Sequence, residues 1–388
     1  MSTTPGTRRN PLPFDPRIPP QLGIRPDDVL VARALPLGLS GNQPWRLTIR
    51  RALTGGMQAY ASRIVKRIVT GEGWLAAASH DTLGRELRLW ESGLLADLPR
   101  PLATPVLAWA RDDRDGGSGV LLMRDVRGRL WPERLTAPTV RLPPQVLTLL
   151  DRLAILHARF WNDARLHDPA LGLMPADAAL TMMGPDSIAR RIASGDGEPY
   201  LPLAAIGWEA FFQLAGSEAA EVLGDALRSP ERIVGAIARL PWTLVHGDIW
   251  GPNLGWLPGT HTAPRAGSRL LLIDWALATA GPATYEPLWL CGTWHALHPP
   301  RVLAAYRARL QRHLAARGIA LSGRAWLALA DAGYLRTALT CGEALGRAAA
   351  EAPAGVAHAR AEGRVRWWAE RAVRGAQRLL SMASAAGD

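Results

Sequence analysis

Three polar residues in one part of the sequence have types and spacing suited to chemistry. Asp248 stands five residues before Asn253, and Asp274 ends an apolar run at residues 271–273. Phosphoryl transfer needs a carboxylate that accepts the proton of the attacking hydroxyl. It also needs an amide and a second carboxylate that hold Mg²⁺ against the phosphates. Asp248, Asn253 and Asp274 therefore match the set that a kinase-type site requires.

A lysine upstream points to the same chemistry. Lys66 is the only lysine among the 45 lysine and arginine residues of the chain. A compact ammonium group contacts phosphate oxygens in a way that a planar guanidinium does not. The pattern of residues 62–69 predicts a strand with Ile64, Lys66 and Ile68 on one face, and a lysine on an inward face needs an anionic partner. The alternative is a strand at the sheet edge with Lys66 in solvent.

Two further segments could position a nucleotide. Residues 81–95 have the spacing of an amphipathic helix and place Glu86 at the margin of its apolar face, where it can reach inward. An exposed ion pair is the alternative for Glu86. Residues 36–44 form a turn-rich loop in which the backbone N–H groups around Gly38, Ser40 and Gly41 could approach phosphates, although most such hairpins merely turn.

Length and composition indicate a globular protein and exclude several other classes. At 388 residues the chain is long enough for two lobes, and its 48% hydrophobic and 20% charged content is that of a globular protein. The formal charge of +11 comes from scattered arginines, which argues against a nucleic-acid site and favours a basic surface that attracts an anionic nucleotide. Cys291 and Cys341 suggest neither a metal site nor a disulfide framework.

Localisation is expected to be cytoplasmic. The first ten residues are polar and basic, without the apolar region of a signal peptide. The most apolar stretch, residues 270–294, contains Asp274, Pro282 and Glu286, so no membrane span is expected. The sequence does not predict the oligomeric state.

The elements change in kind along the chain. Six prolines between Pro5 and Pro20 indicate a tail at residues 1–26. Strands are expected at residues 29–35, 45–50, 62–69, 105–110 and 119–126. Helices are expected at residues 145–162, 208–228, 231–240, 302–317, 323–347 and 357–382. The order predicts an α+β protein with a small antiparallel lobe carrying one helix, residues 27–126, and a large helical lobe, residues 127–388.

These motifs in this order resemble the aminoglycoside phosphotransferase and choline kinase superfamily, whose members have a protein-kinase-like bilobal fold. The resemblance rests on residues 246–248, Asn253 and residues 273–275, and it covers residues 27–300. It implies that Asp248 is the catalytic carboxylate, that Asn253 and Asp274 bind Mg²⁺, and that Lys66 and Glu86 form a pair that holds the ATP phosphates. It also implies that residues 121–126 end in the hinge beside adenine, with contacts from Met123, Arg124 and Val126.

The sequence departs from the family pattern at several positions. Trp275 stands where protein kinases have Phe-Gly and no activation segment follows, which disfavours a protein kinase. Trp250 occupies a position where many aminoglycoside-type members have His, and it is expected beside the acceptor. Glu286 replaces an acidic residue of the family's Asp-Leu-Ala triplet and is a second acceptor-side candidate. His246 is expected to be a scaffold residue.

The acceptor is expected to be a small hydroxylated metabolite or natural product. After Ala276 the chain has fourteen arginines and seven acidic residues, which disfavours a polycationic aminoglycoside. An acidic pocket elsewhere in the helical region would still allow an aminoglycoside or another antibiotic as acceptor. A non-catalytic nucleotide-binding regulator is the alternative of another class. Six tryptophans near the motifs could line an acceptor pocket, and core packing is expected for about half of them: Trp242, Trp250, Trp256, Trp275, Trp289 and Trp294.

Overall fold

The computed structural model describes residues 22–35, 44–52, 58–71, 73–111, 118–132, 142–260 and 263–385. The chain divides into two compact units. The strand unit comprises Met1–Thr70 and Pro105–Asp125, and the helical unit comprises Gly71–Thr104 and Val126–Asp388. Residues 71–104 thus group with the helical unit. The sequence placed a nucleotide-binding lobe at residues 27–126 and a catalytic lobe at residues 127–388. That functional assignment remains a prediction.

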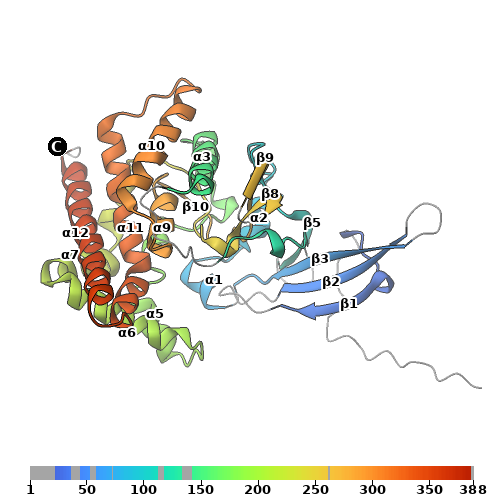
Figure 1. The fold of residues 1–388 in the computed structure, drawn as a ribbon, viewed down its shortest axis with the longest axis horizontal. Coiled ribbons are helices and arrows are strands. Elements are labelled where there is room, and N and C mark those ends of the chain that lie inside the picture. Colours follow the sequence, from blue (N-terminus) through green and yellow to red (C-terminus); the bar gives the residue numbers. More distant parts are fainter. Residues whose placement is uncertain are drawn as a thin grey trace, which may run out of the picture. The chain divides into compact units, whose positions relative to one another are not determined.

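The strand unit is a five-stranded antiparallel sheet in the order β1-β2-β3-β6-β5 (Figure 1). A short 3-10 helix, Pro26–Asp28, precedes it. One face of the sheet buries Leu47, Val65 and Leu122 in an apolar cluster, as the alternation of strand side chains requires. The expected strands are confirmed, and their bounds are β1 Val29–Ala34, β2 Pro44–Ala52, β3 Gln58–Ile68, β5 Val106–Arg111 and β6 Gly119–Arg124.

Lys66 lies on an inner strand of this sheet. β3 pairs with β2 on one side and β6 on the other, with Lys66 opposite Pro44 and Leu121. The side chain of Lys66 is buried, with 7% exposed, whereas the next residue, Arg67, is exposed. The alternative of a solvated lysine on an edge strand is therefore wrong. Gly38, Ser40 and Gly41, the candidates for the phosphate loop, lie outside the described residues.

The helical unit contains small sheets among its helices. β4 Leu102–Ala103, β9 Ala263–Leu272 and β8 Leu254–Thr260 form one sheet in that order, and β10 Thr279–Gly281 pairs with β7 Thr243–Val245. The helices are α1 Trp74–Ala78, α2 Arg85–Glu91, α3 Pro144–Arg159, α4 Ala176–Thr181, α5 Pro185–Ala193, α6 Tyr200–Ala215, α7 Ser217–Arg228, α8 Glu231–Ile237, α9 Tyr285–Thr293, α10 Pro299–Ala315, α11 Gly323–Ala350 and α12 Val356–Ser384. Short 3-10 helices occupy Arg127–Arg129, Ala164–His167, Pro169–Leu171 and Gly251–Asn253. The α+β class with a helical carboxy-terminal part is confirmed.

Two helices differ from the expected ones because of glycine. The segment expected as one helix at residues 208–228 is two helices, since Gly216 has a φ of 87° and ends α6. The helix expected at residues 81–95 begins only at Arg85, because Gly84 adopts the left-handed conformation. The Asp81 carboxylate accepts a hydrogen bond from the Arg85 backbone at 2.8 Å, but the N-cap position itself is held by Gly84.

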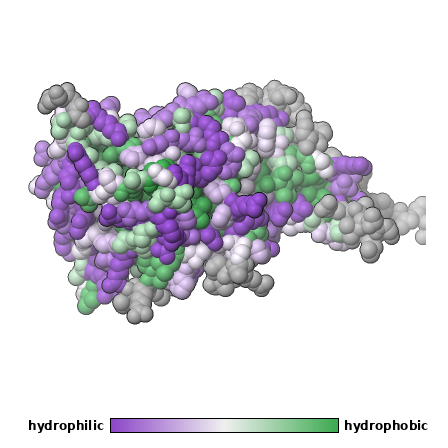
Figure 2. Space-filling view, turned by 90° about the horizontal axis from the view of Figure 1, so that it is seen from above, coloured by the Kyte–Doolittle hydropathy of each residue, from purple (hydrophilic) through white to green (hydrophobic). Residues whose placement is uncertain are grey.

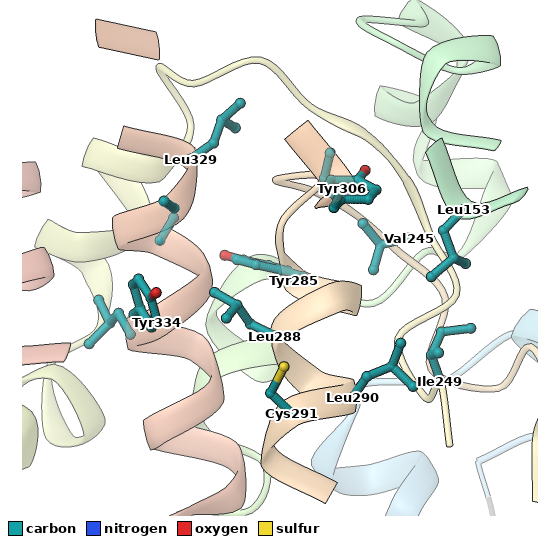
Figure 3. Close-up of a cluster of buried hydrophobic side chains, with 14 of the residues drawn as sticks. Leu153, Val245, Ile249, Tyr285, Leu288, Leu290, Cys291, Tyr306, Leu329 and Tyr334 are labelled. Carbon is teal, nitrogen blue, oxygen red and sulfur yellow. The ribbon is translucent and has the colours of Figure 1, made fainter. Parts of the chain in front are cut away.

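α11 is the central helix of the unit and packs against α6, α9 and α12. Glycine allows the close approach to α6: a Cβ on Gly346 would lie 1.9 Å from the carbonyl oxygen of Gly207. Figure 3 shows Val245 and Ile249, the two residues that flank the segment 246–248, in a buried cluster with side chains from α3, α9, α10 and α11. The core therefore anchors the motif on both sides.

Figure 2 shows hydrophilic residues over much of the visible face, with smaller hydrophobic patches among them. In the part of the chain that the structure describes, no helix combines the length and the apolar character that crossing a membrane would require.

Candidate active site

The segment that carries Asp248 leaves β7 through a turn that only glycine fits. Gly247 has a φ of 87°, a conformation that side chains with a Cβ rarely adopt. A Cβ at this position would also lie 2.0 Å from the carbonyl oxygen of Leu277. The turn brings Asp248 out of the core, and its side chain is partly exposed while its neighbour Ile249 is buried.

Asn253 holds the carboxylate of Asp248 directly. Its Nδ2 donates to Asp248 Oδ2 at 2.8 Å and to the Asp248 backbone oxygen at 3.1 Å. The backbone folds tightly between the two residues, since Trp250 N donates to Asp248 O and Asn253 N donates to Trp250 O. The spacing of five residues is thus a compact turn that places an amide on a carboxylate.

The same turn is tied to the segment of Asp274. In the β8–β9 pair, Leu254 is opposite Leu272, so the residues just beyond each strand end lie together. Ile273 N donates to Asn253 O at 3.1 Å. Asp274 itself has a φ of 61°, an uncommon conformation for a residue other than glycine that concentrates at functional sites.

The donor set suits a hard cation. Because Nδ2 of Asn253 is engaged with Asp248, its Oδ1 is the atom left for a metal, and Asp274 offers carboxylate oxygens. Mg²⁺ prefers oxygen ligands and is commonly held by one or two protein groups together with substrate phosphates. Within the described ranges, no group of three or more His, Cys, Asp and Glu side chains is placed to hold a metal ion.

His246 links the two segments from inside. Its Nδ1 accepts a hydrogen bond from Asp248 N at 3.3 Å, so its Nε2 carries the proton that reaches Ile273 O at 2.9 Å. The ring is fully buried, and its centroid lies 4.6 Å from that of Trp275. These contacts fit the expected scaffold role, since the imidazole is occupied on both nitrogens.

Glu286 lies behind this loop in the core. Its Oε1 accepts a hydrogen bond from His246 N, and its Oε2 lies 2.8 Å from Nε2 of His157. The other ring nitrogen of His157 contacts the Tyr306 hydroxyl. Burial alone would raise the pKa of Glu286, but His157 and His246 outweigh it and the pKa is lowered. With 1% exposed, Glu286 is poorly placed for the direct acceptor contact expected from the sequence.

Arg336 is a second buried charge behind the loop, and no pattern in the sequence singled it out. Its Nη2 donates to the carbonyl oxygen of Gly247 at 3.2 Å. Its guanidinium faces the rings of Tyr285 and Trp289 at 4.9 and 5.1 Å from their centroids. Burial lowers its pKa, and Tyr285 is first among the groups that oppose this effect. A lone arginine in the apolar stretch at residues 334–341 was the available signal.

The first turn of α2 holds the segment that follows Asp274. Glu86 is buried, and its Oε1 lies 3.4 Å from the backbone nitrogen of Trp275. Arg85 is also buried and donates to the carbonyl oxygens of Gly172 and Ala276. Glu86 therefore points into the helical unit toward the metal-binding candidate. Its pairing with Lys66, which belongs to the strand unit, remains a prediction.

The residues expected beside adenine lie near the end of β6. Met123 is buried and Arg124 is exposed in the strand unit. Val126 belongs to the helical unit, where it packs with Ala103 and Leu271. Their contact with a purine remains a prediction.

A pocket of about 320 Å³ opens at Trp250, two residues after Asp248. The carboxy-terminal end of α9 and the last turns of α11 form its other walls. Of the six tryptophans near the motifs, Trp256, Trp275 and Trp294 are core residues with at most 1% exposed. Trp250 is partly exposed and lines the pocket, and the buried Trp294 also contributes to its lining.

Comparisons with known proteins find similarity in structure. No protein-family model matches the chain, and no curated protein sequence matches it either. A putative aminoglycoside phosphotransferase from Ralstonia eutropha JMP134 is 18% identical with a TM-score of 0.42, covering 91% of this chain and 95% of that one. A choline kinase from Cryptosporidium parvum Iowa II is 11% identical with a TM-score of 0.46, covering 95% and 94%.

An ethanolamine kinase from Plasmodium vivax is 11% identical with a TM-score of 0.43, covering 91% of this chain and 83% of that one. The three alignments cover most of this chain. The low identities and TM-scores show that each similarity is distant.

Proposed function

We propose that this protein is a phosphotransferase that uses ATP and Mg²⁺ to phosphorylate a hydroxyl group of a small molecule. The observation that carries the proposal is the contact of Asn253 Nδ2 with the Asp248 carboxylate at 2.8 Å. Through its backbone oxygen, the same residue is tied to Ile273, next to Asp274. A proton acceptor and two oxygen ligands for a metal are thereby joined in one hydrogen-bonded unit.

Each residue has a distinct role in this proposal. Asn253 fixes the carboxylate of Asp248, which in this proposal orients the acceptor hydroxyl and takes its proton. Asn253 Oδ1 and Asp274 hold Mg²⁺, which neutralises charge on the phosphates when it is bound. Lys66 is the nucleotide-binding cation, and Glu86 keeps both Lys66 and the segment after Asp274 in place. Gly38, Ser40 and Gly41 supply backbone donors for phosphate.

Glu286 and Arg336 act as positioning residues in the same proposal. Glu286 holds the backbone of His246, and Arg336 holds the carbonyl of Gly247, so both grip the residues that precede Asp248. Fixing a proton acceptor before the substrate arrives is a main source of rate in phosphoryl transfer, because little reorganisation is then needed. Both residues support the site from the core.

We propose that the acceptor is not a polycation. The chain after Ala276 carries fourteen arginines and seven acidic residues, an excess of seven positive charges (14 − 7). The pocket at Trp250 includes one of these arginines, Arg347, and one acid, Glu351. Matched acceptors of different charge, described in the next subsection, test this part of the proposal.

Replacement of the proton acceptor tests the reaction itself. Asp248→Asn should lower kcat by roughly 10²–10⁴-fold, the usual contribution of a positioned general base. Nucleotide binding should persist, because the metal ligands Asn253 and Asp274 are unchanged. The measurement is ATP-dependent phosphorylation across a panel of hydroxylated metabolites, with nucleotide affinity measured by calorimetry.

The control is Asp225→Asn, which removes an exposed carboxylate paired with Arg228 and should leave kcat unchanged. An Asp248→Asn protein that phosphorylates its acceptor at the wild-type rate would show that the assigned role is wrong. A wild-type protein that binds Mg·ATP but phosphorylates no acceptor would instead favour a nucleotide-binding regulator.

A further inference from the structure

The pocket at Trp250 contains a cation, Arg347, that has a buried hydrogen-bond donor without a partner among the described residues. Arg347 lies on α11 and lines the pocket together with Trp250, His295 and Glu351. Its side chain is 29% exposed, so it is accessible from the pocket. Its Nε is buried and makes no hydrogen bond to any residue that the structure describes. A buried donor without a partner is costly, which favours a ligand that supplies one.

The two carboxylates near Arg347 make no close ion pair with its guanidinium. Glu343 Oε2 lies 3.9 Å from its Nε, and Glu351 Oε1 lies 3.9 Å from its Nη1, both beyond hydrogen-bonding distance. Glu351 is 61% exposed, so solvent screens its charge. The other oxygen of Glu343 accepts a hydrogen bond from the Tyr200 hydroxyl at 3.0 Å, and burial raises the pKa of Glu343.

The wall around Arg347 is suited to a small ligand with an apolar body. Ala344, Ala348 and Trp250 line the pocket together with Arg347. A guanidinium binds a carboxylate through two parallel hydrogen bonds, a geometry that selects a planar anion. With Glu351 nearby, one guanidinium balances a single negative charge better than a doubly charged phosphate.

We propose that this pocket binds a carboxylate of the acceptor through Arg347, so that the substrate is a small hydroxylated carboxylic acid with an apolar body lying against Trp250. The proposal rests on the phosphotransferase function and deepens it. Trp250 is bonded through its backbone to both Asp248 and Asn253, so a molecule held at Arg347 and Trp250 lies next to the proposed proton acceptor.

Three matched probes test the charge preference. They are 4-(hydroxymethyl)benzoate, its methyl ester and 4-(hydroxymethyl)benzylamine, which share one benzyl alcohol and carry a negative, neutral and positive para substituent. The carboxylate should bind at least about 10-fold more tightly than the ester or the amine, as expected for a charge-assisted hydrogen-bonded pair. Dissociation constants come from calorimetry or saturation-transfer NMR, and phosphorylation of the alcohol is followed with ATP.

Substitutions of Arg347 test whether this residue causes the preference for a carboxylate. Arg347→Gln should weaken carboxylate binding by about 10- to 100-fold and change ester binding little, so that the preference disappears. Arg347→Lys, which keeps the charge but loses the two-pronged geometry, should be intermediate. The control Arg366→Gln removes an exposed arginine paired with Glu362 and should preserve the preference. Melting temperatures of all variants establish that each one folds.

The outcomes separate the two proposals. Equal binding of the three probes, tighter binding of the amine, or an unchanged preference in Arg347→Gln would overturn the carboxylate site. If the alcohol of the ester or amine is then phosphorylated in an Asp248-dependent way, the phosphotransferase stands without this site. If the carboxylate binds through Arg347 but neither it nor any other alcohol is phosphorylated, the phosphotransferase proposal fails.

Discussion

Two buried charged residues hold the loop that carries Asp248. Glu286 and Arg336 are 1% and 2% exposed, and each bonds a backbone group of the turn that precedes the carboxylate. Charges so deeply buried are retained only when they are paired or hydrogen-bonded, and removing one partner leaves the other uncompensated. Burying these two charges costs stability, and we infer that they are retained because they fix the geometry of the site.

Glu286→Gln should destabilise the protein in a pH-dependent way. The change removes the charge that pairs with His157, and loss of one partner of a buried pair costs roughly 3–5 kcal/mol. Because the folded protein lowers the pKa of Glu286 below its ordinary 4.5, its stabilising effect is present above that pH. The effect is lost as pH falls below 4.5 through the folded pKa. Urea unfolding of both proteins from pH 7 to pH 3 measures the difference.

Glu362→Gln provides the comparison for Glu286. Its carboxylate pairs with Arg366 and lies 3.3 Å from Nε2 of His358 on α12, and surface pairs of this kind contribute only about 0–1 kcal/mol each. A destabilisation by Glu286→Gln that is as small as this, or that grows as the pH falls, would contradict the assignment of a stabilising buried carboxylate.

At the scale of elements, the packing of α11 against α6 depends on glycines. Cβ atoms on Gly207 and Gly346 would lie 2.2 Å and 1.9 Å from backbone carbonyl oxygens of the facing helix. Contacts this close to rigid backbone cannot be relieved by rotating a side chain. Because α11 also carries Arg336 and Arg347, the crossing places both arginines relative to the rest of the helical unit.

Gly346→Ala should therefore destabilise the helical unit, whereas Gly363→Ala should not. Forcing a methyl group into the crossing costs roughly 1–3 kcal/mol or more, because the helices must separate. Gly363 lies within α12, and a Cβ there would have no neighbour within 4 Å among the described residues. Alanine at that position should raise the free energy of unfolding by roughly 0.5–1 kcal/mol, because alanine favours a helix more than glycine does. Denaturant unfolding of the two variants makes the comparison, and equal effects would contradict the role of the crossing.

At the scale of the whole molecule, the protein offers nucleotide-binding candidates in both units. Lys66, Met123 and Arg124 belong to the strand unit, and Glu86, Asn253 and Asp274 belong to the helical unit. A ligand that binds the folded chain and not the unfolded chain stabilises it by mass action. Nucleotide binding can therefore be measured without knowing the acceptor.

Mg·ATP should raise the melting temperature of the protein, and EDTA should remove most of this increase. At a ligand concentration of 100 times Kd, the stabilisation is about 2.7 kcal/mol. Asp274→Ala should lose the part that depends on Mg²⁺, whereas Asp225→Ala, which alters an exposed carboxylate, should retain it. Differential scanning fluorimetry measures the shift. An equal shift with and without Mg²⁺ in the wild-type protein would argue against Asp274 as a metal ligand.

Sequence patterns predicted much of the fold because they report local physics. The alternation around Lys66 predicted a strand with its lysine inward, and β3 is an inner strand with Lys66 buried. The long helices α10, α11 and α12 were also expected. α10 and α12 bury one face each, whereas α11 is buried almost all round between Ala328 and Gly346. The helix bounds near Gly84 and Gly216 were wrong, because a left-handed glycine ends a helix whatever its neighbours prefer.

The sequence by itself determined the candidate catalytic and metal-binding residues. Asp248, Asn253 and Asp274 are recognisable because a short turn and a strand end fix their spacing. Only the tertiary structure decided what surrounds them. Arg336 and Arg347 stand far along the chain from Asp248, and Glu286 was expected at the acceptor rather than in the core. Such placements arise from the packing of α9 and α11, and contacts between distant segments leave no periodic signal in the sequence.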